Sequence, residues 1–362
     1  MATAAKLTCK VCGFKSGNLV PHIETEHAAL GLKAYMDQHG GMDSVIHPDL
    51  KKKAETTEAP VAAGKVRIGV TEVERVESNP ELADSIPSID NAYHFPAVTA
   101  EVINDMTKKR PVLLIGHTGT GKTSLVQQVA ARIGQPTARA NMNGQTSISD
   151  FTGFWAVKAG ETYWVDGVLP HAMKNGLWLI IDELDFAEAP ILSVLNSVLE
   201  SNGTLMLKEK GNEVVRAHKN FRIFATANAI GQYAEFRGLY QGTNIMNEAF
   251  LDRWRCYVIE YLPSDIEAKV LAAAVPRMTE TIAKELVKVA AMARQAFINE
   301  ELQCTFSTRR LLDWAEQTIH FHKLGEQAPF KAAESTIFSK ISRENGTVVK
   351  GFMSRILLGK NP

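Results

Sequence analysis

The sequence is short of cysteine, of long apolar runs and of charge of one sign, and each shortage excludes a class of protein. Only 4 of the 362 residues are cysteine, too few for a disulfide scaffold and typical of a reducing compartment. No apolar run approaches the ~20 residues that cross a bilayer, and the N-terminus lacks the apolar stretch of a secretory signal. Lysine plus arginine equals aspartate plus glutamate, 40 each, so no overall field favours a nucleic-acid or membrane partner. We therefore expect a cytoplasmic protein without a membrane span.

Composition and apolar pattern divide the chain into four segments. Residues 51–65 contain charges, alanine, threonine and proline but few large apolar residues, which is typical of a flexible linker. Short apolar runs alternate with helical patterns over 66–262, and helical patterns alone follow over 263–362. Strands that alternate with helices predict a parallel sheet covered on both faces. We expect a small head in 1–50, an α/β core of αβα type and an all-helical C-terminal domain.

The individual elements are predicted from apolar periodicity. The expected core strands are Val112–Ile115, Leu177–Ile181, Phe221–Thr226 and Cys256–Leu262. The expected helices include Thr123–Ile133, Pro190–Glu200, Lys284–Phe297 and Arg310–Phe321. Within Pro190–Glu200 the apolar residues recur at helical spacing, which indicates one buried face.

A glycine-rich motif for phosphate binding follows the first predicted strand. Residues 116–123 read GHTGTGKT and fit G-x-x-x-x-G-K-[ST] between a strand and a helix. Glycines let the backbone aim N–H groups at phosphate oxygens, and the helix N-terminus adds partial positive charge. We expect Lys122 to reach the β- and γ-phosphates of ATP and the Thr123 hydroxyl to bind Mg²⁺; a chance glycine-rich turn is the alternative. The predicted nucleotide-binding residues are Gly116, His117, Thr118, Gly119, Thr120, Gly121, Lys122, Thr123, Ser124 and Asp182.

Two adjacent carboxylates and an amide follow later strands. Asp182 and Glu183 end the run LWLIIDE, at the sheet edge where open α/β sheets bind ligands. We expect Asp182 to hold Mg²⁺ and Glu183 to polarise the attacking water, although a solvated acidic turn would look similar. Asn228 ends the strand FRIFATAN, where its amide would contact that water or the γ-phosphate as a sensor, or would simply end the strand.

An arginine before the last core strand is a candidate for action on a neighbouring subunit. Arg253 lies in NEAFLDRW, and its guanidinium has no expected partner in its own site. An arginine finger stabilises transition-state charge on the phosphates. Arg255 competes for this role, and a surface ion pair of Arg253 with Asp252 or Glu248 is the alternative.

This motif set resembles the AAA+ ATPases of the MoxR clade and, within it, the cobaltochelatase ATPase (CobS-like) family. The resemblance covers roughly residues 66–350, and its segments include GHTGTGKT, IIDE, FRIFATAN, GLYQGTNIMNEAFLDRW, YLPSDIEAK, ARQAFINEEL and STRRLLDWAE. It implies an αβα core with a helical lid, a hexameric ring and a protein partner with a von Willebrand A domain. It also implies ATP-driven remodelling of a partner complex, which in cobaltochelatase inserts Co²⁺ into a corrinoid.

The resemblance also implies roles for particular residues. Glu183, Asn228 and Arg253 match the family's catalytic positions. STRR begins a C-terminal helix from which Arg309 or Arg310 would reach the γ-phosphate, or which is simply solvated. The family's Ser-x-Arg pattern selects Arg309.

Two inserts of the family correspond to predicted β-hairpins. They span Phe154–Asp166, which turns around Ala159-Gly160, and Thr204–Arg216. In the family such inserts face the pore or the partner. The candidate contact residues are Trp155, Tyr163 and Trp164, and a hairpin packed on its own core is an equal alternative.

The head contains four residues spaced as in a zinc finger. Cys9, Cys12, His22 and His27 have the residue types of a tetrahedral Zn²⁺ site. The nine residues between Cys12 and His22 resemble the Ros/MucR-type finger, which binds DNA. However, the stretch NLVPHIETEH has glutamates and no arginine, whereas phosphate and guanine recognition depend on lysine and arginine. We expect a protein-docking finger rather than a DNA-binding one, and a cap that only stabilises the chain is the remaining alternative.

Three functions are compatible with these motifs. The first is an ATP-driven remodelling ring of the MoxR type, which the complete hydrolytic set favours. The second is a DNA-associated ATPase or regulator directed by the finger, which the acidic finger stretch disfavours. The third is a nucleotide-dependent scaffold that hydrolyses ATP slowly.

Overall fold

The structure is a computed structural model in which two compact units, residues 1–62 and 63–362, are distinguished. It describes residues 7–12, 15–16, 19, 23, 38, 64–77, 79–200, 203–240 and 242–359. In the first unit β1 (Leu7–Thr8) pairs antiparallel with β2 (Lys15–Ser16). Cys9 and Cys12 therefore lie in the connection between two paired strands.

The second unit is built on a five-stranded parallel sheet of order β13-β5-β12-β9-β6. Its strands are β5 (Val112–Ile115), β6 (Thr137–Asn141), β9 (Trp178–Asp182), β12 (Arg222–Ala227) and β13 (Arg255–Val258). The predicted parallel α/β core is confirmed. The edge strand β6 was not predicted because its sequence, TARAN, has no large apolar residue.

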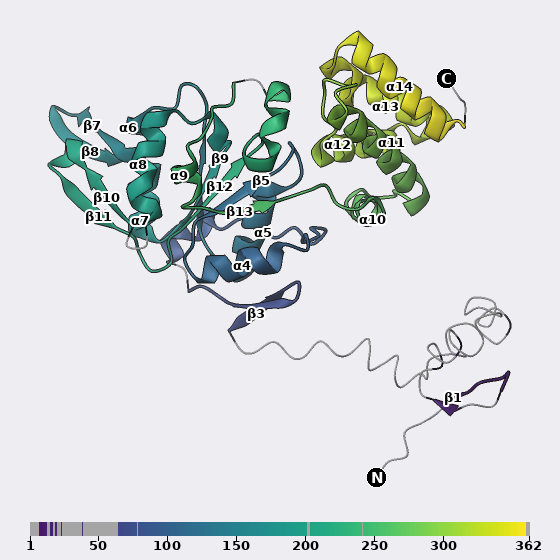
Figure 1. Ribbon diagram of the computed structural model, residues 1–362, viewed down its shortest axis with the longest axis horizontal. Coiled ribbons are helices and arrows are strands. Elements are labelled where there is room, and N and C mark those ends of the chain that lie inside the picture. Colours follow the sequence, from purple (N-terminus) through teal and green to yellow (C-terminus); the bar gives the residue numbers. More distant parts are fainter. Residues whose placement is uncertain are drawn as a thin grey trace. The chain divides into compact units, whose positions relative to one another are not determined.

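Helices cover both faces of this sheet, as Figure 1 shows. The core helices are α4 (Thr99–Thr107), α5 (Lys122–Ile133), α6 (Ile148–Thr152), α7 (Val168–Asn175), α8 (Ala189–Leu199) and α9 (Glu248–Leu251). Alternate residues of β5 enter different cores, because side chains alternate along a strand. Leu113 and Ile115 pack with α7 and α8, whereas Val112 and Leu114 pack with α4 and α5.

Three antiparallel hairpins flank the sheet. They are β3 (Lys65–Ile68) with β4 (Thr71–Glu74), β7 (Gly153–Lys158) with β8 (Glu161–Asp166), and β10 (Thr204–Leu207) with β11 (Glu213–Arg216). The last two coincide with the predicted inserts. Of the candidate contact residues, Trp155 is 54% and Tyr163 46% exposed, whereas Trp164 is half-buried.

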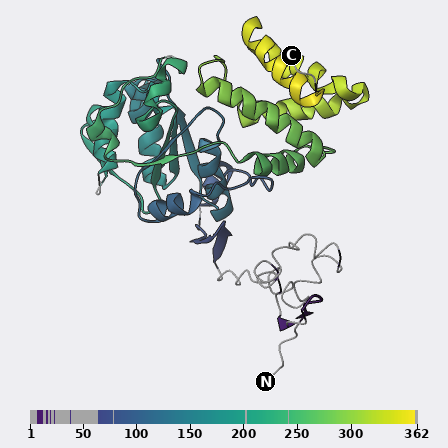
Figure 2. The ribbon, with the colours of Figure 1, turned by 45° about the vertical axis from the view of Figure 1, so that its right-hand side comes forward.

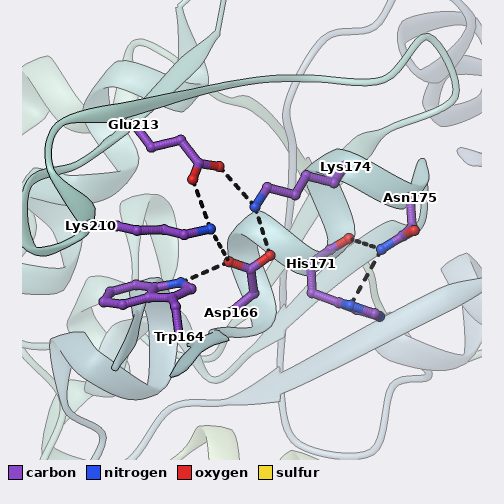
Figure 3. Close-up of polar contacts among 7 residues, drawn as sticks. All are labelled: Trp164, Asp166, His171, Lys174, Asn175, Lys210 and Glu213. Carbon is purple, nitrogen blue, oxygen red and sulfur yellow. Dashed lines mark hydrogen bonds and ion pairs between the residues drawn. The ribbon is translucent and has the colours of Figure 1, made fainter. Parts of the chain in front are cut away.

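Charged side chains tie both inserts to α7 (Figure 3). The Asp166 carboxylate accepts hydrogen bonds from Lys174 at 2.7 Å and from the Trp164 indole at 2.8 Å. Glu213 pairs with Lys174 at 3.0 Å and with Lys210 at 2.7 Å. Opposite charges thus alternate around a ring of four side chains that we call the hairpin tetrad: Asp166, Lys174, Glu213 and Lys210.

The C-terminal region is helical, as predicted (Figures 1 and 2). It has its own apolar core. Its helices are α10 (Ser264–Ala274), α11 (Glu280–Ile298), α12 (Thr308–His320), α13 (Ala328–Thr336) and α14 (Arg343–Leu357). Trp314 and Phe306 are fully buried at its centre with ring centroids 5.9 Å apart. We call these five helices the lid. Among the described residues, no helix has both the length and the apolar character needed to cross a membrane.

Candidate active site

The phosphate-binding loop joins β5 to α5, and its glycines are required by their surroundings. A Cβ atom at Gly116 would lie 2.2 Å from the carbonyl oxygen of Ile259. Gly121 is the N-cap of α5 at φ 90° and ψ 18°, a left-handed conformation that glycine adopts without strain. No described side chain caps this helix, so the positive end of its dipole is available to an anion.

Lys122 is buried at the start of α5 and binds three oxygen atoms. Its Nζ donates to the carbonyl oxygens of Gly116 at 2.7 Å and His117 at 2.9 Å, and to Oδ1 of Asn228 at 2.9 Å. Asn228 directly follows β12, which neighbours β5 in the sheet. The structure therefore brings the predicted loop lysine and the predicted sensor amide into contact.

The charge of Lys122 is poorly compensated in this position. Burial lowers the pKa of its amine to about 8, and the carboxylates of Asp185, Asp182 and Glu183 only partly oppose that shift. A buried ammonium whose direct partners are neutral oxygens gains strongly from an anionic partner. Phosphate oxygens are anions of this kind.

Asp182, at the end of β9, is 5% exposed, and both of its oxygens are hydrogen-bonded. Oδ1 accepts from the hydroxyls of Thr123 at 2.5 Å and Thr226 at 3.1 Å. Oδ2 accepts from Nε of Arg139 at 3.0 Å. A threonine hydroxyl and a carboxylate side by side are hard oxygen donors that fit Mg²⁺.

Glu183 follows in a strained backbone conformation. Its φ of 59° and ψ of 44° are left-handed, which costs a non-glycine residue about 1 kcal/mol or more. Burial, together with the charges of Asp185 and Asp182, raises the pKa of its carboxyl. No hydrogen bond or ion pair of that carboxyl to another described residue is present, so it is available to a water molecule.

Asp185 is a site residue that the sequence reasoning missed. It is fully buried, and its Oδ2 accepts from the backbone N–H groups of Asn228 at 2.8 Å and Ala229 at 3.0 Å. Its Oδ1 has no partner among the described residues. Asp185 therefore fixes the sensor segment and places a negative charge near Lys122. Its position three residues after Asp182 in IIDELD was the available signal.

Arg139 and Thr226 were also missed, for different reasons. Arg139 lies on the unpredicted strand β6, and its pairing with Asp182 becomes visible only when β6 is placed beside β9. Thr226 lies within a buried apolar strand, where its hydroxyl also accepts the N–H of Glu183 at 3.1 Å. Arg139 belongs to no sequence motif, whereas Thr226 lies inside the segment FRIFATAN, of which only Asn228 was predicted as a site residue.

Arg253 is not brought to this site. Its Nε donates to Glu200 at 2.9 Å and its Nη1 donates to the carbonyl of Ala249, so its ion-pair partner is Glu200 and not Asp252 or Glu248. It lines a cleft of about 980 Å³ near the amino ends of β5, β12 and β13. The phosphate-binding loop follows the carboxyl end of β5. The two sites therefore lie at opposite edges of one parallel sheet.

Arg309 is exposed in the first turn of α12, and no hydrogen bond or ion pair links it to another described residue. The neighbouring Arg310 differs, because its Nη1 donates to the Thr305 carbonyl at 2.8 Å. Ser307 caps α12 and packs directly on the loop, since a Cβ atom at Gly119 would lie 2.2 Å from the Cβ of Ser307. The helix that carries Arg309 therefore begins at the phosphate-binding loop.

The predicted zinc ligands are described only in part. Cys9 is buried and Cys12 is exposed, whereas His22 and His27 lie outside the described residues. Within the described part of the chain, no group of three or more histidine, cysteine or acidic side chains is arranged to hold a metal ion.

Two segments of the chain match known protein families. Residues 111–253 match the AAA domain of the dynein-related subfamily. Residues 267–352 match the C-terminal region of the CbbQ/NirQ/NorQ proteins. Together the two segments contain four of the five strands of the sheet, the phosphate-binding loop and most of the lid, whereas β13 lies between them.

Individual relatives match the same part of the chain. The aerobic cobaltochelatase subunit CobS of Sinorhizobium sp is 37% identical over 247 residues, which are 65% of this chain and 74% of CobS. Midasin of Dictyostelium discoideum is 32% identical over 228 residues, which are 61% of this chain but only 4% of midasin. An uncharacterized protein of Staphylococcus haemolyticus is 29% identical over 214 residues, which are 57% of this chain and 76% of the relative.

Proposed function

Because this chain belongs to the MoxR-type AAA ATPases, the family that includes its CobS relative, we propose that it is an ATP-hydrolysing motor subunit that works in a ring. An AAA ATPase is expected to use ATP and Mg²⁺. The observation that supports the catalytic role of these particular residues is their convergence at one edge of the sheet. At this edge Lys122 is hydrogen-bonded to Asn228, and Thr123 is hydrogen-bonded to Asp182. Glu183 is the next residue in the chain after Asp182.

Each residue has a role that follows from its surroundings. Lys122 neutralises phosphate charge, and the backbone N–H groups at the start of α5 orient the phosphate chain. Thr123 and Asp182 would hold Mg²⁺, which when bound neutralises charge on the phosphates. The Glu183 carboxyl has no hydrogen-bond or ion-pair partner among the described residues, and its raised pKa makes it a stronger base toward the attacking water. Asn228 accepts a hydrogen bond from Lys122 and would contact the γ-phosphate or the attacking water.

The test is the Glu183→Gln variant. It should bind ATP normally but release phosphate ~10²- to 10⁴-fold more slowly, because the group that accepts the proton is removed. Glu188→Gln, an exposed carboxylate at the start of α8, is the matched control and should turn over ATP at the wild-type rate. ATP binding and phosphate release are measured separately. Wild-type turnover by Glu183→Gln would remove Glu183 from the mechanism.

We further propose a hexameric ring that acts on a partner with a von Willebrand A domain, in a metal-insertion complex similar to the one that contains CobS. Support comes from the CobS relative and from Arg253, which lies at the sheet edge opposite its own phosphate-binding loop. Exposed aromatic residues on β7 and β8, such as Trp155 and Tyr163, provide a surface for such a partner. Affinity capture with the wild-type chain should retain the partner, and a Trp155→Ser/Tyr163→Ser double variant should lose it.

We also propose that the head binds one Zn²⁺ through Cys9, Cys12, His22 and His27 and works as a protein-docking finger in the cytoplasm. The two cysteines lie in the connection of a two-stranded hairpin, a geometry that suits a zinc knuckle. Metal analysis should find about one zinc per chain, and Cys9→Ser should lose it while Cys256→Ser should not. If the zinc content is unchanged in Cys9→Ser, this ligand set is wrong. DNA binding by the isolated chain at physiological salt would favour the DNA-associated alternative.

A further inference from the structure

Consecutive residues of the phosphate-binding loop contact the lid or the segment that leads to it. The ring of His117 meets the ring of Phe297 on α11 at a centroid distance of 5.6 Å. The hydroxyl of Tyr261, between β13 and α10, donates to the carbonyl of Thr118 at 2.7 Å. Gly119 packs against Ser307 at the start of α12. Three successive loop residues therefore contact the lid or the segment before it.

The Thr118 peptide is held on both sides. Its carbonyl accepts from Tyr261, and its N–H donates to the hydroxyl of Tyr240 at 3.2 Å. The hydroxyl of Tyr240 also lies 2.9 Å from Nδ1 of His117. Tyr240 directly follows the 3-10 helix Gly231–Leu239, which comes after β12 in the chain. The conformation of the loop at Thr118 therefore depends on two tyrosines from outside the loop.

Tyr261 is also attached to the most buried ion pair among the described residues. The guanidinium of Arg294 lies 3.8 Å from the centroid of the Tyr261 ring. Arg294 donates to both oxygens of Glu267 at 2.7 Å and 2.8 Å, and its Nε donates to the carbonyl of Phe306 at 2.8 Å. Arg294 is 7% and Glu267 1% exposed. All three guanidinium nitrogens of Arg294 thus have a partner. Moving Arg294 or Glu267 away would leave an unpaired buried charge, and we therefore expect this pair to resist displacement.

This network ends at the first residues of α12. Oε1 of Glu267 accepts from the hydroxyl of Thr308 at 2.9 Å, and the Tyr261 hydroxyl lies 3.0 Å from the hydroxyl of Thr305. The next residue after Thr308 is Arg309. A shift of α12 relative to the loop must therefore break one of these contacts, break the Tyr261–Thr118 hydrogen bond, or move the loop with it.

We propose that Tyr261 is a positioning residue for ATP hydrolysis, which couples the conformation of the phosphate-binding loop at Thr118 to the position of the lid arginine Arg309. The proposal rests on the proposed ATPase function. Tyr261 acts through its two ends: the ring holds the Arg294–Glu267 pair, and the hydroxyl holds the loop. Loop and lid arginine are thereby presented to the phosphates as one unit.

The test is Tyr261→Phe, which keeps the ring against Arg294 and removes only the hydroxyl. We expect kcat/KM for ATP to fall roughly three- to tenfold, the effect of one net hydrogen bond. In an Arg309→Ala background the same substitution should change kcat/KM less than about twofold, because residues that act as a unit are not additive. Hydrogen exchange should rise in residues 116–123 and 305–311.

Tyr257→Phe is the matched control. Tyr257 lies on β13, and its hydroxyl donates to Asp105 at 2.6 Å, away from the loop. Loss of the Tyr257 hydroxyl should lower the unfolding temperature without changing kcat/KM or the hydrogen exchange of residues 116–123. The control therefore distinguishes a loss of stability from a loss of loop positioning. The proposal is overturned if Tyr261→Phe leaves kcat/KM unchanged, or if it has the same effect with and without Arg309. Absence of ATP turnover by the wild-type chain would instead overturn the proposed function.

Discussion

Individual residues of the site are placed where burial works against their usual ionisation. Burial lowers the pKa of the Lys122 amine to about 8. Burial is also the main cause that raises the pKa of the Glu183 carboxyl. Burial makes the lysine responsive to phosphate, and partial desolvation together with the charges of Asp185 and Asp182 makes the glutamate more basic. The two groups are complementary parts of one environment.

The first prediction concerns Lys122 and pH. The free protein should lose the Lys122 proton above pH 8, whereas phosphate binding favours the charged amine and raises its pKa. ATP binding should therefore take up almost no proton at pH 7 and most of one proton at pH 8.5, and affinity should weaken as the pH rises. Calorimetric titrations in buffers of different ionisation enthalpy measure this uptake.

Asp185→Asn tests the cause of that pH dependence. The amide can still accept from the N–H groups of Asn228 and Ala229, but the largest carboxylate contribution that raises the pKa of Lys122 is removed. The onset of proton uptake should move to lower pH. Equal uptake at pH 7 and 8.5 in the wild-type protein would contradict the assignment of the titrating group to Lys122.

At the scale of elements, the hairpin tetrad fastens two inserts to one helix. Burial alone would raise the pKa of Asp166, but hydrogen bonds from Lys174 and Trp164 outweigh it and keep that pKa below its ordinary value. A carboxyl with a depressed folded-state pKa stabilises the fold above its unfolded pKa, near 4, and this contribution disappears as the pH falls through the folded value.

The second prediction is that Asp166→Asn lowers the free energy of unfolding by about 1 kcal/mol at pH 7 and low salt. The difference from wild type should shrink in 1 M salt and disappear as the pH falls below the depressed folded-state pKa of Asp166, where the wild-type carboxyl is also neutral. Urea denaturation at several pH values measures it. Glu334→Gln, from the exposed pair with Lys331, is the control and should have almost no effect. An Asp166→Asn effect that does not diminish as the pH falls through the folded-state pKa of Asp166 would show that charge is not its cause.

The lid contact supports a third prediction at the same scale. Gly119→Ala would place a Cβ atom 2.2 Å from the Cβ and 2.9 Å from the Cα of Ser307, at a φ of 78°. We expect α12 to be displaced and ATP turnover to fall at least tenfold while the chain remains folded. Gly211→Ala has a similar φ of 70° but open space around it, so it should cost only stability. Circular dichroism and phosphate release measure the two effects.

For the whole molecule, the separation of Arg253 from the phosphate-binding loop of its own chain supports the proposed action between subunits. The loop lies at the carboxyl end of β5 and Arg253 lines a cleft at the amino ends of three strands, so one chain cannot bring them together without rearranging the sheet. A ring in which each subunit presents this edge to the loop of the next would complete the site.

The fourth prediction follows for mixed assemblies. Arg253→Ala alone should reduce turnover ~10³-fold or more, and adding it to wild-type chains should lower their specific activity more than dilution does. Arg343 is an exposed lid arginine, and adding Arg343→Ala chains should lower the specific activity only by dilution. Phosphate release is measured at a fixed wild-type concentration with increasing variant. Activity that follows the wild-type fraction in both series would exclude a finger supplied by the neighbour.

Local sequence determined the loop, the sheet type and the helical lid, because each has a signature in a few adjacent residues. Glycines at Gly116 and Gly121 permit a turn that other residues cannot adopt, and alternating apolar runs specify strands covered on both faces. Only the tertiary structure decided which side chains complete the site. Arg139 carries no motif, the contacts of Asp185 with the segment after β12 form only in the folded sheet, and Tyr261 meets Thr118 only because the end of β13 lies beside the loop. Such contacts join residues far apart in sequence, and no local pattern encodes them.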